Sequence, residues 1–377
     1  MVSDKRKSEL ILYSVSSWSE RDVQRYKIAE IEANGNTVFL LSRKDLQQAG
    51  WKKKFENNSK TNRIFLSLHM GPLPAALQFW ILSQDRISWG YWIPNPIPES
   101  INKALVKGLF GYSLSQLRLR VRSIIVRLAK ILYFAIFRPN LFIYGGNALL
   151  AMPECFMSKR QIAGVSCDWS LAKESLSDMR CWDDETDCEF AVFLDEYEPY
   201  HPDRDLLKNY SGVLPENGEY YFSELSSFFD SFEKFYKVPV IIAAHPKSSY
   251  ERGNEFEKRS VIFDRTRELI LSDQCKLVLT HKSTAVSFAV IARKPIVFLD
   301  VESGELDYRA GIHNLANQLD GKVITVDEAV SGKLLQFNQM RNVNAYQGYI
   351  KEYLCSTMSN DKKVETAVLE ALSIHNR

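Results

Sequence analysis

The sequence predicts an α/β protein of two Rossmann-like, doubly wound domains that face each other across a cleft. Short apolar runs alternate with longer helical patterns along the chain, and strands that alternate with helices form parallel sheets covered on both faces. The 377 residues exceed one ordinary core, since domains average roughly 150 residues. The alternating pattern restarts at Glu189, which indicates a second sheet after the first.

Six apolar runs are expected to form the sheet of the first domain, which we place at residues 1–185. The segment 20–34 lies between the first two runs and is patterned as a helix, with Gly35 at its expected end. A long helix rich in basic residues, 114–138, precedes the fifth run. The domain is expected to end within the acidic segment 178–189, which has no strand pattern. The six runs are 9–17, 36–42, 62–68, 85–93, 139–146 and 160–166.

The second domain, expected at residues 186–340, repeats the pattern. The final segment, 341–377, is patterned as a helix but has no following strand, so we expect it to pack back on the first domain. Helices of the second domain are expected at 221–237, 266–274 and 284–293. Its strands are expected at 189–197, 238–246, 259–264, 276–283, 294–300 and 322–326.

Composition indicates a folded protein without a global field of one sign. Apolar residues make up 45% of the chain, which is enough to build two cores. The 48 basic and 46 acidic residues give a net charge of +2, so nothing here favours nucleic acid as a partner. The six cysteines lack CxxC spacing, and the first ten residues lack the apolar core of a signal peptide. We therefore expect a cytoplasmic protein with ordinary thiols.

The basic segment 114–138 is the one candidate for membrane contact. No run in the chain reaches the roughly 18 apolar residues of a membrane span. This segment instead mixes Leu, Ile, Val and Phe with cations, and such a helix can lie on an anionic membrane surface. The alternative is a buried domain helix whose basic side chains extend outward to water. Its cations include Arg118, Arg120, Arg122, Arg127 and Lys130.

The carboxyl ends of the strands are the places to look for a site, because ligands of doubly wound sheets bind there. The apolar run 238–244 ends in His245, Pro246 and Lys247, followed by Ser248. Proline cannot continue the ladder of strand hydrogen bonds, so the chain turns away at this point. The resulting corner carries several hydrogen-bond donors and suits a phosphate group.

A second polar corner follows the run that ends at Thr280. His281, Lys282, Ser283 and Thr284 come next and are expected to open a helix. Free N–H groups and the helix dipole make such a start a good anion site. The alternative for the two hydroxyl residues is helix capping alone. Two such corners in one domain favour a shared ligand.

Two further strand ends carry carboxylates. Asp195 and Glu196 follow the run 189–194, with His201 six residues after Asp195, and these residues are candidates for catalysis or substrate binding. A lone aspartate after a strand is often only a turn residue. Asp168 follows the last strand of the first domain and is a candidate general base or nucleophile. Its alternative is an N-cap of the next helix.

Other ligand motifs are weak or missing. Gly145, Gly146 and Asn147 form a turn after a strand, which indicates either close packing or one wall of an acceptor site. No HxxxH or HExxH pattern indicates a metal, and no GxGxxG or Walker sequence indicates a dinucleotide or a kinase-type phosphate loop. We therefore expect no metal and no cofactor.

The segments "FLDEYEPYHPD", "AAHPKSSYE" and "HKSTAVSFAV" together resemble a known family. They are similar to GT-B glycosyltransferases that use CMP-activated acidic sugars, such as sialyltransferases and transferases of 3-deoxy-octulosonic acid, and to bacterial surface-polysaccharide proteins. The resemblance covers about half the chain, from Asp168 to Asp300. It implies that His245, Ser283 and Thr284 hold CMP, and that Asp168 is the catalytic carboxylate.

The resemblance implies transfer of an acidic sugar from CMP to a surface glycan, through an oxocarbenium-like state. The glycan acceptor would be presented at the cytoplasmic face of the inner membrane. Asp168 would deprotonate the acceptor if the configuration inverts, and Asp168 or Asp195 would form a covalent adduct if it is retained. Alternatives are a CDP-polyol phosphotransferase, which resembles the same architecture, a nucleotide-sugar epimerase, and a non-catalytic partner in glycan assembly.

Overall fold

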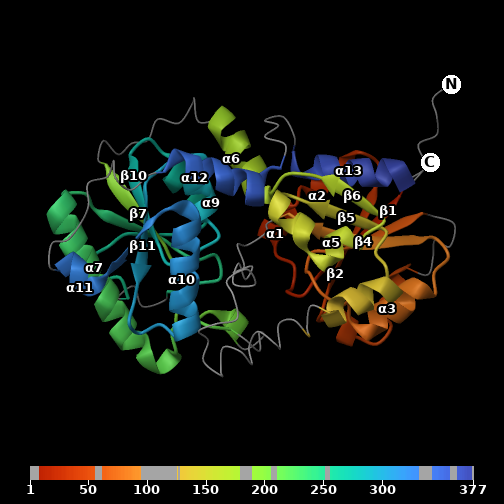
Figure 1. Cartoon of the computed structure of the whole chain (residues 1–377), viewed down its shortest axis with the longest axis horizontal. Coiled ribbons are helices and arrows are strands. Elements are labelled where there is room, and N and C mark those ends of the chain that lie inside the picture. Colours follow the sequence, from red (N-terminus) through yellow and green to blue (C-terminus); the bar gives the residue numbers. More distant parts are fainter. Residues whose placement is uncertain are drawn as a thin grey trace, which may run out of the picture. The chain divides into compact units, whose positions relative to one another are not determined.

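The structure, a computed structural model, forms two compact units, each built on one sheet (Figure 1). Unit 1 holds the chain up to Leu171, together with its last segment from Lys351, and unit 2 holds Ala172–Ile350. The expected domain boundaries at 185–186 and 340–341 lie outside the described residues. The structure describes residues 8–55, 62–94, 125, 128–178, 189–204, 210–250, 255–330, 342–356 and 363–375.

The sheet of unit 1 has six parallel strands in the order β2-β1-β3-β4-β5-β6. The inner strands are short runs rich in apolar, β-branched or aromatic residues, as expected for strands buried on both faces, whereas the last strand begins with the exposed Arg160 and Gln161. The expectation of six strands is confirmed, with shorter bounds. The strands are β1 (Glu9–Ser14), β2 (Thr37–Ser42), β3 (Arg63–Ser67), β4 (Ile87–Ile93), β5 (Leu141–Tyr144) and β6 (Arg160–Ala163).

The helices of unit 1 differ from the expectation at one point. The single helix expected at 20–34 is split, because Lys27 takes a left-handed conformation (φ 54°). Residues 128–136 are helical, whereas Arg118, Arg120, Arg122 and Arg127 of the expected basic helix lie outside the described residues. The named helices are α1 (Glu20–Arg25), α2 (Ile28–Ala33), α3 (Ala75–Leu82), α5 (Pro153–Phe156), α6 (Cys167–Asp178) and α13 (Val364–His375).

The sheet of unit 2 also has six parallel strands, in the order β12-β11-β10-β7-β8-β9. Counted from its own first strand, β7, this is the Rossmann order 3-2-1-4-5-6, whose topological switch point lies between the first and fourth strands. These strands are β7 and β10 here. The strands are β7 (Phe190–Leu194), β8 (Val240–Ala243), β9 (Val261–Ile262), β10 (Cys275–Thr280), β11 (Ile296–Asp300) and β12 (Lys322–Thr325).

Helices connect the strands of unit 2 and cover the sheet. The longest, α7, buries an aromatic face that includes Phe228, Phe229 and Phe232, as expected for an amphipathic helix on a sheet. The helix after β11, α10, was not anticipated from the sequence. The helices are α7 (Gly218–Tyr236), α8 (Thr266–Leu271), α9 (Val286–Ile291), α10 (Leu306–Leu319), α11 (Val326–Val330) and α12 (Val343–Tyr349).

The C-terminal segment from Lys351 onward belongs to unit 1, whereas α12 packs against α9 and α10 in unit 2. Helix α13 packs against α2, β5 and β6. The backbone ahead of it runs beside the end of β5, where the Ser166 amide donates to the Leu354 carbonyl (2.7 Å) and the Ser356 amide donates to the Gly145 carbonyl (3.3 Å). This close passage leaves no room for a side chain at Gly146, since a Cβ there would lie 2.2 Å from the Glu352 carbonyl oxygen.

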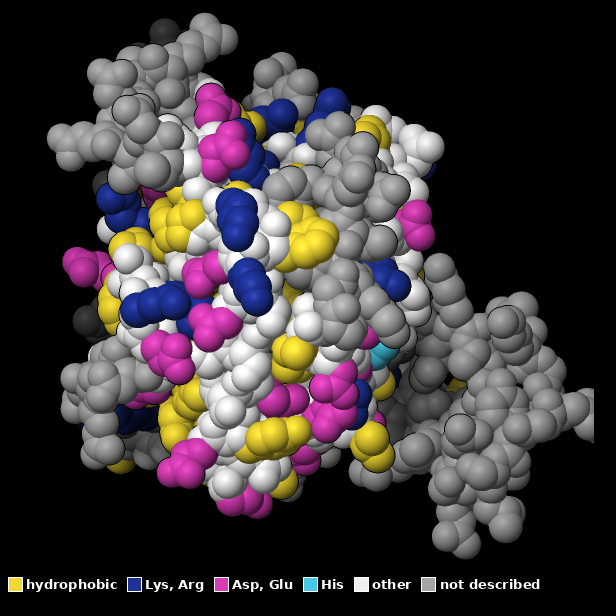
Figure 2. Space-filling view, turned by 90° about the vertical axis from the view of Figure 1, so that its left-hand side faces the viewer, with side chains coloured by type: hydrophobic (Ala, Val, Ile, Leu, Met, Phe, Trp, Pro, Cys, Tyr) yellow, Lys and Arg dark blue, Asp and Glu magenta, His cyan; other side chains and the backbone are white. Residues whose placement is uncertain are grey.

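The surface of the described residues is mixed in charge. Figure 2 shows a face on which basic, acidic and separate hydrophobic side chains are interspersed, in keeping with the near balance of charge in the chain. Among the described residues, no helix is both long and apolar enough to cross a membrane.

Candidate functional site at the carboxyl edge of unit 2

Three strand ends lie at one level on the carboxyl edge of unit 2. Leu194 of β7 pairs with Thr280 of β10 on one side and with Ala243 of β8 on the other. The residues that follow these strands therefore emerge together at the switch point, where doubly wound sheets bind their ligands. Both polar corners expected from the sequence, 245–248 and 281–284, lie on this edge.

Asp195 fastens the corner that follows β8. Its Oδ2 accepts hydrogen bonds from the His245 amide (3.0 Å) and the Tyr250 hydroxyl (2.9 Å), and its Oδ1 accepts from the Tyr197 amide (2.8 Å). The carboxyl group is buried, and desolvation raises its pKa to about 6 against these hydrogen bonds, which lower it. These contacts give Asp195 the task of holding the loop, which the expectation of a catalytic carboxylate did not include.

The corner after β8 turns back on itself. The Ser248 hydroxyl and amide both donate to the His245 carbonyl (2.6 and 2.8 Å), and the Lys247 amide donates to Nδ1 of His245 (3.1 Å). Pro246 and Lys247 are exposed, while the His245 side chain is half-buried. The ring of His201 packs edge-to-face against the His245 ring at a centroid distance of 4.8 Å.

Glu196 fastens the other corner. It accepts hydrogen bonds from the Lys282 amide (2.5 Å) and the Tyr308 hydroxyl (3.1 Å), and desolvation raises its pKa to about 7. The ammonium group of Lys282 lies over the Tyr308 ring, 4.5 Å from its centroid, and donates to the Ser211 carbonyl (3.3 Å). Glu196 therefore positions a loop, and the Lys282 side chain is directed to a neighbouring segment.

His281 corrects an expectation, since it cannot serve as a phosphate ligand. Its side chain is fully buried, Nδ1 lies 2.7 Å from the Leu299 carbonyl oxygen, and Nε2 lies 3.1 Å from the Tyr221 hydroxyl. A carbonyl only accepts, so Nδ1 carries the proton and Nε2 accepts from the tyrosine. Desolvation lowers the pKa of His281 to about 4, which keeps the ring neutral. The histidine joins β10 to β11 and α7.

Ser283 and Thr284 lie in a turn ahead of the helix. The helix α9 begins at Val286, two residues later than its expected start at Thr284. The Ser283 amide donates to Oγ1 of Thr280, and Oγ of Ser283 accepts from the Ala285 amide (3.3 Å each). Thr284 is exposed and Ser283 half-buried. The hydroxyls therefore line the edge next to β7 without capping the helix.

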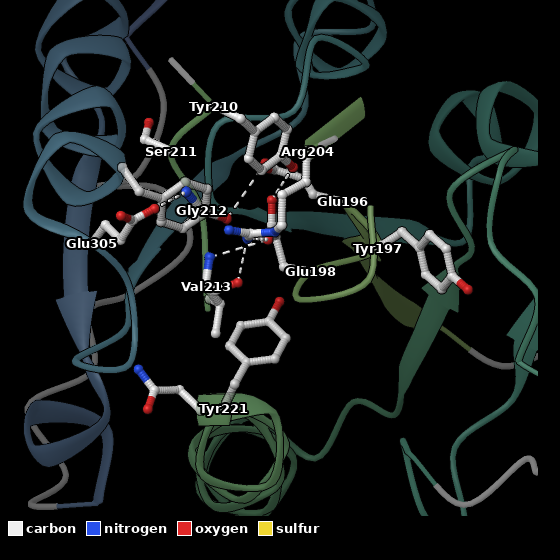
Figure 3. A network of polar contacts seen from close by, with 12 residues as sticks. Glu196, Tyr197, Glu198, Arg204, Tyr210, Ser211, Gly212, Val213, Tyr221 and Glu305 are labelled. Atoms are coloured by element: carbon white, nitrogen blue, oxygen red, sulfur yellow. Dashed lines mark hydrogen bonds and ion pairs between the residues drawn. The ribbon is translucent and has the colours of Figure 1, made fainter. Parts of the chain in front are cut away.

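A third carboxylate, Glu198, organises a network that the sequence reading missed (Figure 3). It accepts from the Arg204 guanidinium (3.2 Å), the Val213 amide (3.0 Å) and the Tyr210 hydroxyl. Nearby, the Gly212 amide donates to Glu305 (3.1 Å). These contacts tie the described parts of the segment 196–213 to the sheet edge. The acidic run Asp-Glu-Tyr-Glu after a strand was the signal available in the sequence.

In unit 1, Asp168 lies in the first turn of α6. It is 4% exposed and its Oδ1 lies 2.9 Å from the Arg25 guanidinium. The pair joins α1 to α6, which was not anticipated. Gly145 and Gly146 pack against Ser166 and Glu352, so their small size serves close backbone passage. Asn147 begins a 3₁₀ turn (Asn147–Ala151).

Metal ligands do not gather in the described part of the chain, where no group of three or more His, Cys, Asp or Glu side chains has the arrangement of a metal site. No protein-family model and no curated protein sequence matches the chain.

The whole chain is similar in structure to the wall teichoic acid polymerase TagF. A TagF structure described as soaked with CDPG matches with a TM-score of 0.53 and 11% identity, over 99% of this chain and 89% of that chain. A second TagF structure matches with a TM-score of 0.50 and 12% identity, over 98% and 88% of the two chains. At this identity the likeness concerns the fold. It confirms the expected α/β architecture of two doubly wound units.

Proposed function

We propose that the chain is a glycosyltransferase that transfers an acidic sugar, of the nonulosonic or 3-deoxy-octulosonic type, from CMP to a surface glycan. The observation that carries the proposal is the pair of polar loops, 245–248 and 281–285, at the switch-point edge of unit 2. Consecutive carboxylates, Asp195 and Glu196, fasten one loop each through backbone N–H groups. Loops fixed in this way hold the side-chain donors that they carry in place for an anionic leaving group.

In this proposal the nucleotide's phosphate lies between the two loops. His245 and Lys247 would contact it from the β8 side, and the hydroxyls of Ser283 and Thr284 from the β10 side. Pro246 shapes the turn of the first loop. His281 and Lys282 support the second loop without contacting the phosphate. Donors aimed at charge that develops on the leaving phosphate usually provide the largest part of the catalytic effect.

Asp168 of unit 1 is the proposed catalytic carboxylate. Its Oδ1 lies 2.9 Å from the Arg25 guanidinium, and a carboxylate is the group that either a general base or a nucleophile requires. Removal of the charge by Asp168→Asn should lower turnover about a thousandfold or more while leaving nucleotide affinity unchanged. The half-buried Glu174, on the same helix, provides the control, Glu174→Gln. Acceptor contacts are proposed for His201 and for the turn at Gly145, Gly146 and Asn147.

A second candidate is transfer of a polyol phosphate from a CDP-activated donor. The likeness to a TagF structure described with CDPG favours this candidate. Sugar transfer from CMP and polyol-phosphate transfer from CDP both need a site for a cytidine nucleotide. The two activities differ in the bond that breaks. Sugar transfer breaks the bond between the anomeric carbon and the phosphate, whereas polyol-phosphate transfer breaks the bond between two phosphates.

Contact with an anionic membrane from the cytoplasmic side is also proposed. In unit 1, one face of the helical residues 128–136 is buried through Phe134 and Phe137. The opposite face exposes Leu128, Leu132 and Ile136 by 60, 65 and 82%. Helical residues spaced four apart share a face, so this apolar stripe faces water. Phe79 and Leu82 of α3 are also exposed.

The test of the proposed function is donor turnover by the purified full chain, without added metal. CMP-activated nonulosonic acid, CMP-activated 3-deoxy-octulosonic acid and CDP-glycerol are each incubated with a mixture of bacterial surface-glycan fragments, and sugar-bearing products are identified by mass spectrometry. We expect a glycoside product from a CMP-activated donor alone. A polyol-phosphate product from CDP-glycerol would replace the first candidate by the second. Release of free sugar without an acceptor product would favour the epimerase.

A further inference from the structure

The loop after β8 determines which ring nitrogen of His245 carries a proton. The Lys247 amide donates a hydrogen bond to Nδ1 of His245 at 3.1 Å. An N–H donor can be met only by an unprotonated ring nitrogen, so the proton of the neutral imidazole is on Nε2. The Ser248 hydroxyl and amide hold the same turn through the His245 carbonyl. The tautomer is therefore built into the backbone of the loop.

The groups packed around His245 come from the end of β7 and from the segment 196–213. From the end of β7, Asp195 accepts the His245 amide, and its other partners are the hydroxyl of Tyr250 and a backbone N–H. Its charge is thus directed to the backbone of His245. From the segment 196–213, a second imidazole, His201, lies against the His245 ring at 4.8 Å.

The far side of His201 is closed by Tyr210, whose ring stacks on it at 5.6 Å with an interplanar angle of 18°. On the loop of His245 itself, the nearest cation is Lys247. A positive His245 would lie against another imidazole, and protonation of Nδ1 would remove the hydrogen bond from the Lys247 amide. Protonation of Nδ1 is therefore opposed by geometry.

We propose that His245 binds the donor's phosphate as a neutral imidazole, donating from Nε2, and that it assists departure of the phosphate by this hydrogen bond without transferring a proton. The inference rests on the proposed function. As the bond between the anomeric carbon and the phosphate oxygen breaks, its electron pair stays on that oxygen. The acceptor hydroxyl forms the new bond to carbon, and its proton passes to the catalytic carboxylate. The reaction then needs no proton from His245.

This role predicts an unusual pH dependence. A histidine that binds as a cation loses its ligand as pH rises through the usual range of the imidazole, near about 6.5. A neutral donor keeps its ligand above that range. At acid pH, ligand binding is limited by Asp195. Desolvation raises the pKa of this carboxyl group to about 6. Below that pH the carboxylate becomes protonated and holds the His245 amide less well. Binding should fall in acid and stay constant in base.

The first test is calorimetric binding of cytidine 5′-(methyl phosphate) between about pH 5 and pH 9. This phosphodiester mimics the donor and does not titrate in that range, whereas CMP itself would. We expect constant affinity from pH 7 to 9 and a fall below pH 6. His245→Gln, which keeps a neutral N–H donor, should bind within about threefold of wild type. His245→Ala should lose about tenfold or more. The control is His313→Gln, on α10.

Loss of affinity above neutral pH, with His245→Gln as weak as His245→Ala, would overturn the inference and leave the proposed function standing. No binding at any pH would overturn both. The second test is ¹⁵N NMR of histidine-labelled protein, with His245→Gln to assign the resonance. We expect Nε2 to show the shift of a protonated nitrogen and Nδ1 that of an unprotonated one at pH 7.5. The reverse pattern would overturn the inference whatever the binding result.

Discussion

The imidazole of His281 is held by two hydrogen bonds inside unit 2 and serves structure, not ligand binding. Replacement by alanine would leave the Leu299 carbonyl and the Tyr221 hydroxyl without their partner and would open a cavity among Phe193, Tyr221 and Tyr308. We expect His281→Ala to lower the free energy of unfolding by about 2–4 kcal/mol. Urea denaturation of the full chain measures this change in the free energy of unfolding.

The matched control for this substitution is His313→Ala. The His313 side chain is 51% exposed and shares Asp300 with Arg309, so its loss should change the free energy of unfolding by less than about 0.5 kcal/mol. Equal losses for the two variants would show that the His281 contacts do not stabilise the fold.

At the level of single residues, sequence reasoning identified side chains by type and position along the strands. It correctly brought Asp195, His245 and Ser283 to one edge, because parallel strands end together. It did not separate His281 from Lys282, since both follow β10 and the burial of one depends on α7 and α10. The helix α10 supplies Tyr308 and was not anticipated.

The loop after β10 depends on one buried carboxylate for its position. Desolvation raises the pKa of Glu196 to about 7 from an ordinary value of 4.5. An acid whose pKa is raised by folding contributes stability below its unfolded value and loses it as pH rises through the folded value. The wild-type free energy of unfolding should therefore fall between about pH 5 and pH 8.

Glu196→Gln should reduce the fall in the free energy of unfolding between pH 5 and pH 8 by about 1–3 kcal/mol, since one pKa unit corresponds to about 1.4 kcal/mol. Urea denaturation at pH 5 and pH 8 gives the difference between wild type and variant at each pH. Glu219→Gln, on the exposed side of α7, should leave the pH dependence unchanged. If the free energy of unfolding of wild type and of Glu196→Gln changed equally between pH 5 and pH 8, the proposed role of Glu196 would be contradicted.

The turn after β5 and the C-terminal segment form one packed element. A Cβ at Gly146 would lie 2.2 Å from the Glu352 carbonyl oxygen, whereas a Cβ at Gly348 would meet no atom within 4 Å. Gly146→Ala should therefore cost unit 1 about 2–4 kcal/mol of its free energy of unfolding. Gly348→Ala should be neutral or slightly stabilising, because alanine favours a helix. Thermal unfolding that ranks the two variants in the opposite order would refute this packing.

Among the elements, strands were predicted better than helices. Runs such as Ile296–Leu299 are apolar throughout, and that pattern suits a strand buried on both faces. The break between α1 and α2 was missed because it depends on the left-handed conformation of Lys27, which the side chain does not reveal. The sequence did not predict that the segment 196–213 forms one network, because that network depends on the hydrogen bonds of Glu198 with its partners.

Across the whole molecule, the two parallel sheets followed from the repeated alternation of strands and helices. The proposed membrane contact belongs to this scale. Substituting Leu128, Leu132 and Ile136 together by glutamine should lower co-sedimentation with phosphatidylglycerol vesicles about tenfold or more, because the stripe supplies the apolar part of the contact. Leu306→Gln is the control, since Leu306 is 83% exposed in unit 2. Unchanged sedimentation of the triple variant would exclude this stripe as the contact.

The central claim is that the loops fastened by Asp195 and Glu196 bind a cytidine nucleotide. The most direct measurement is calorimetric titration of the full chain with CMP, CDP, UDP and GDP, without added metal, for wild type and His245→Ala. The account predicts binding of a cytidine nucleotide in preference to the uridine and guanosine nucleotides, weakened about tenfold or more in the variant. Preference for UDP or GDP, or cytidine binding that His245→Ala leaves unchanged, would contradict it.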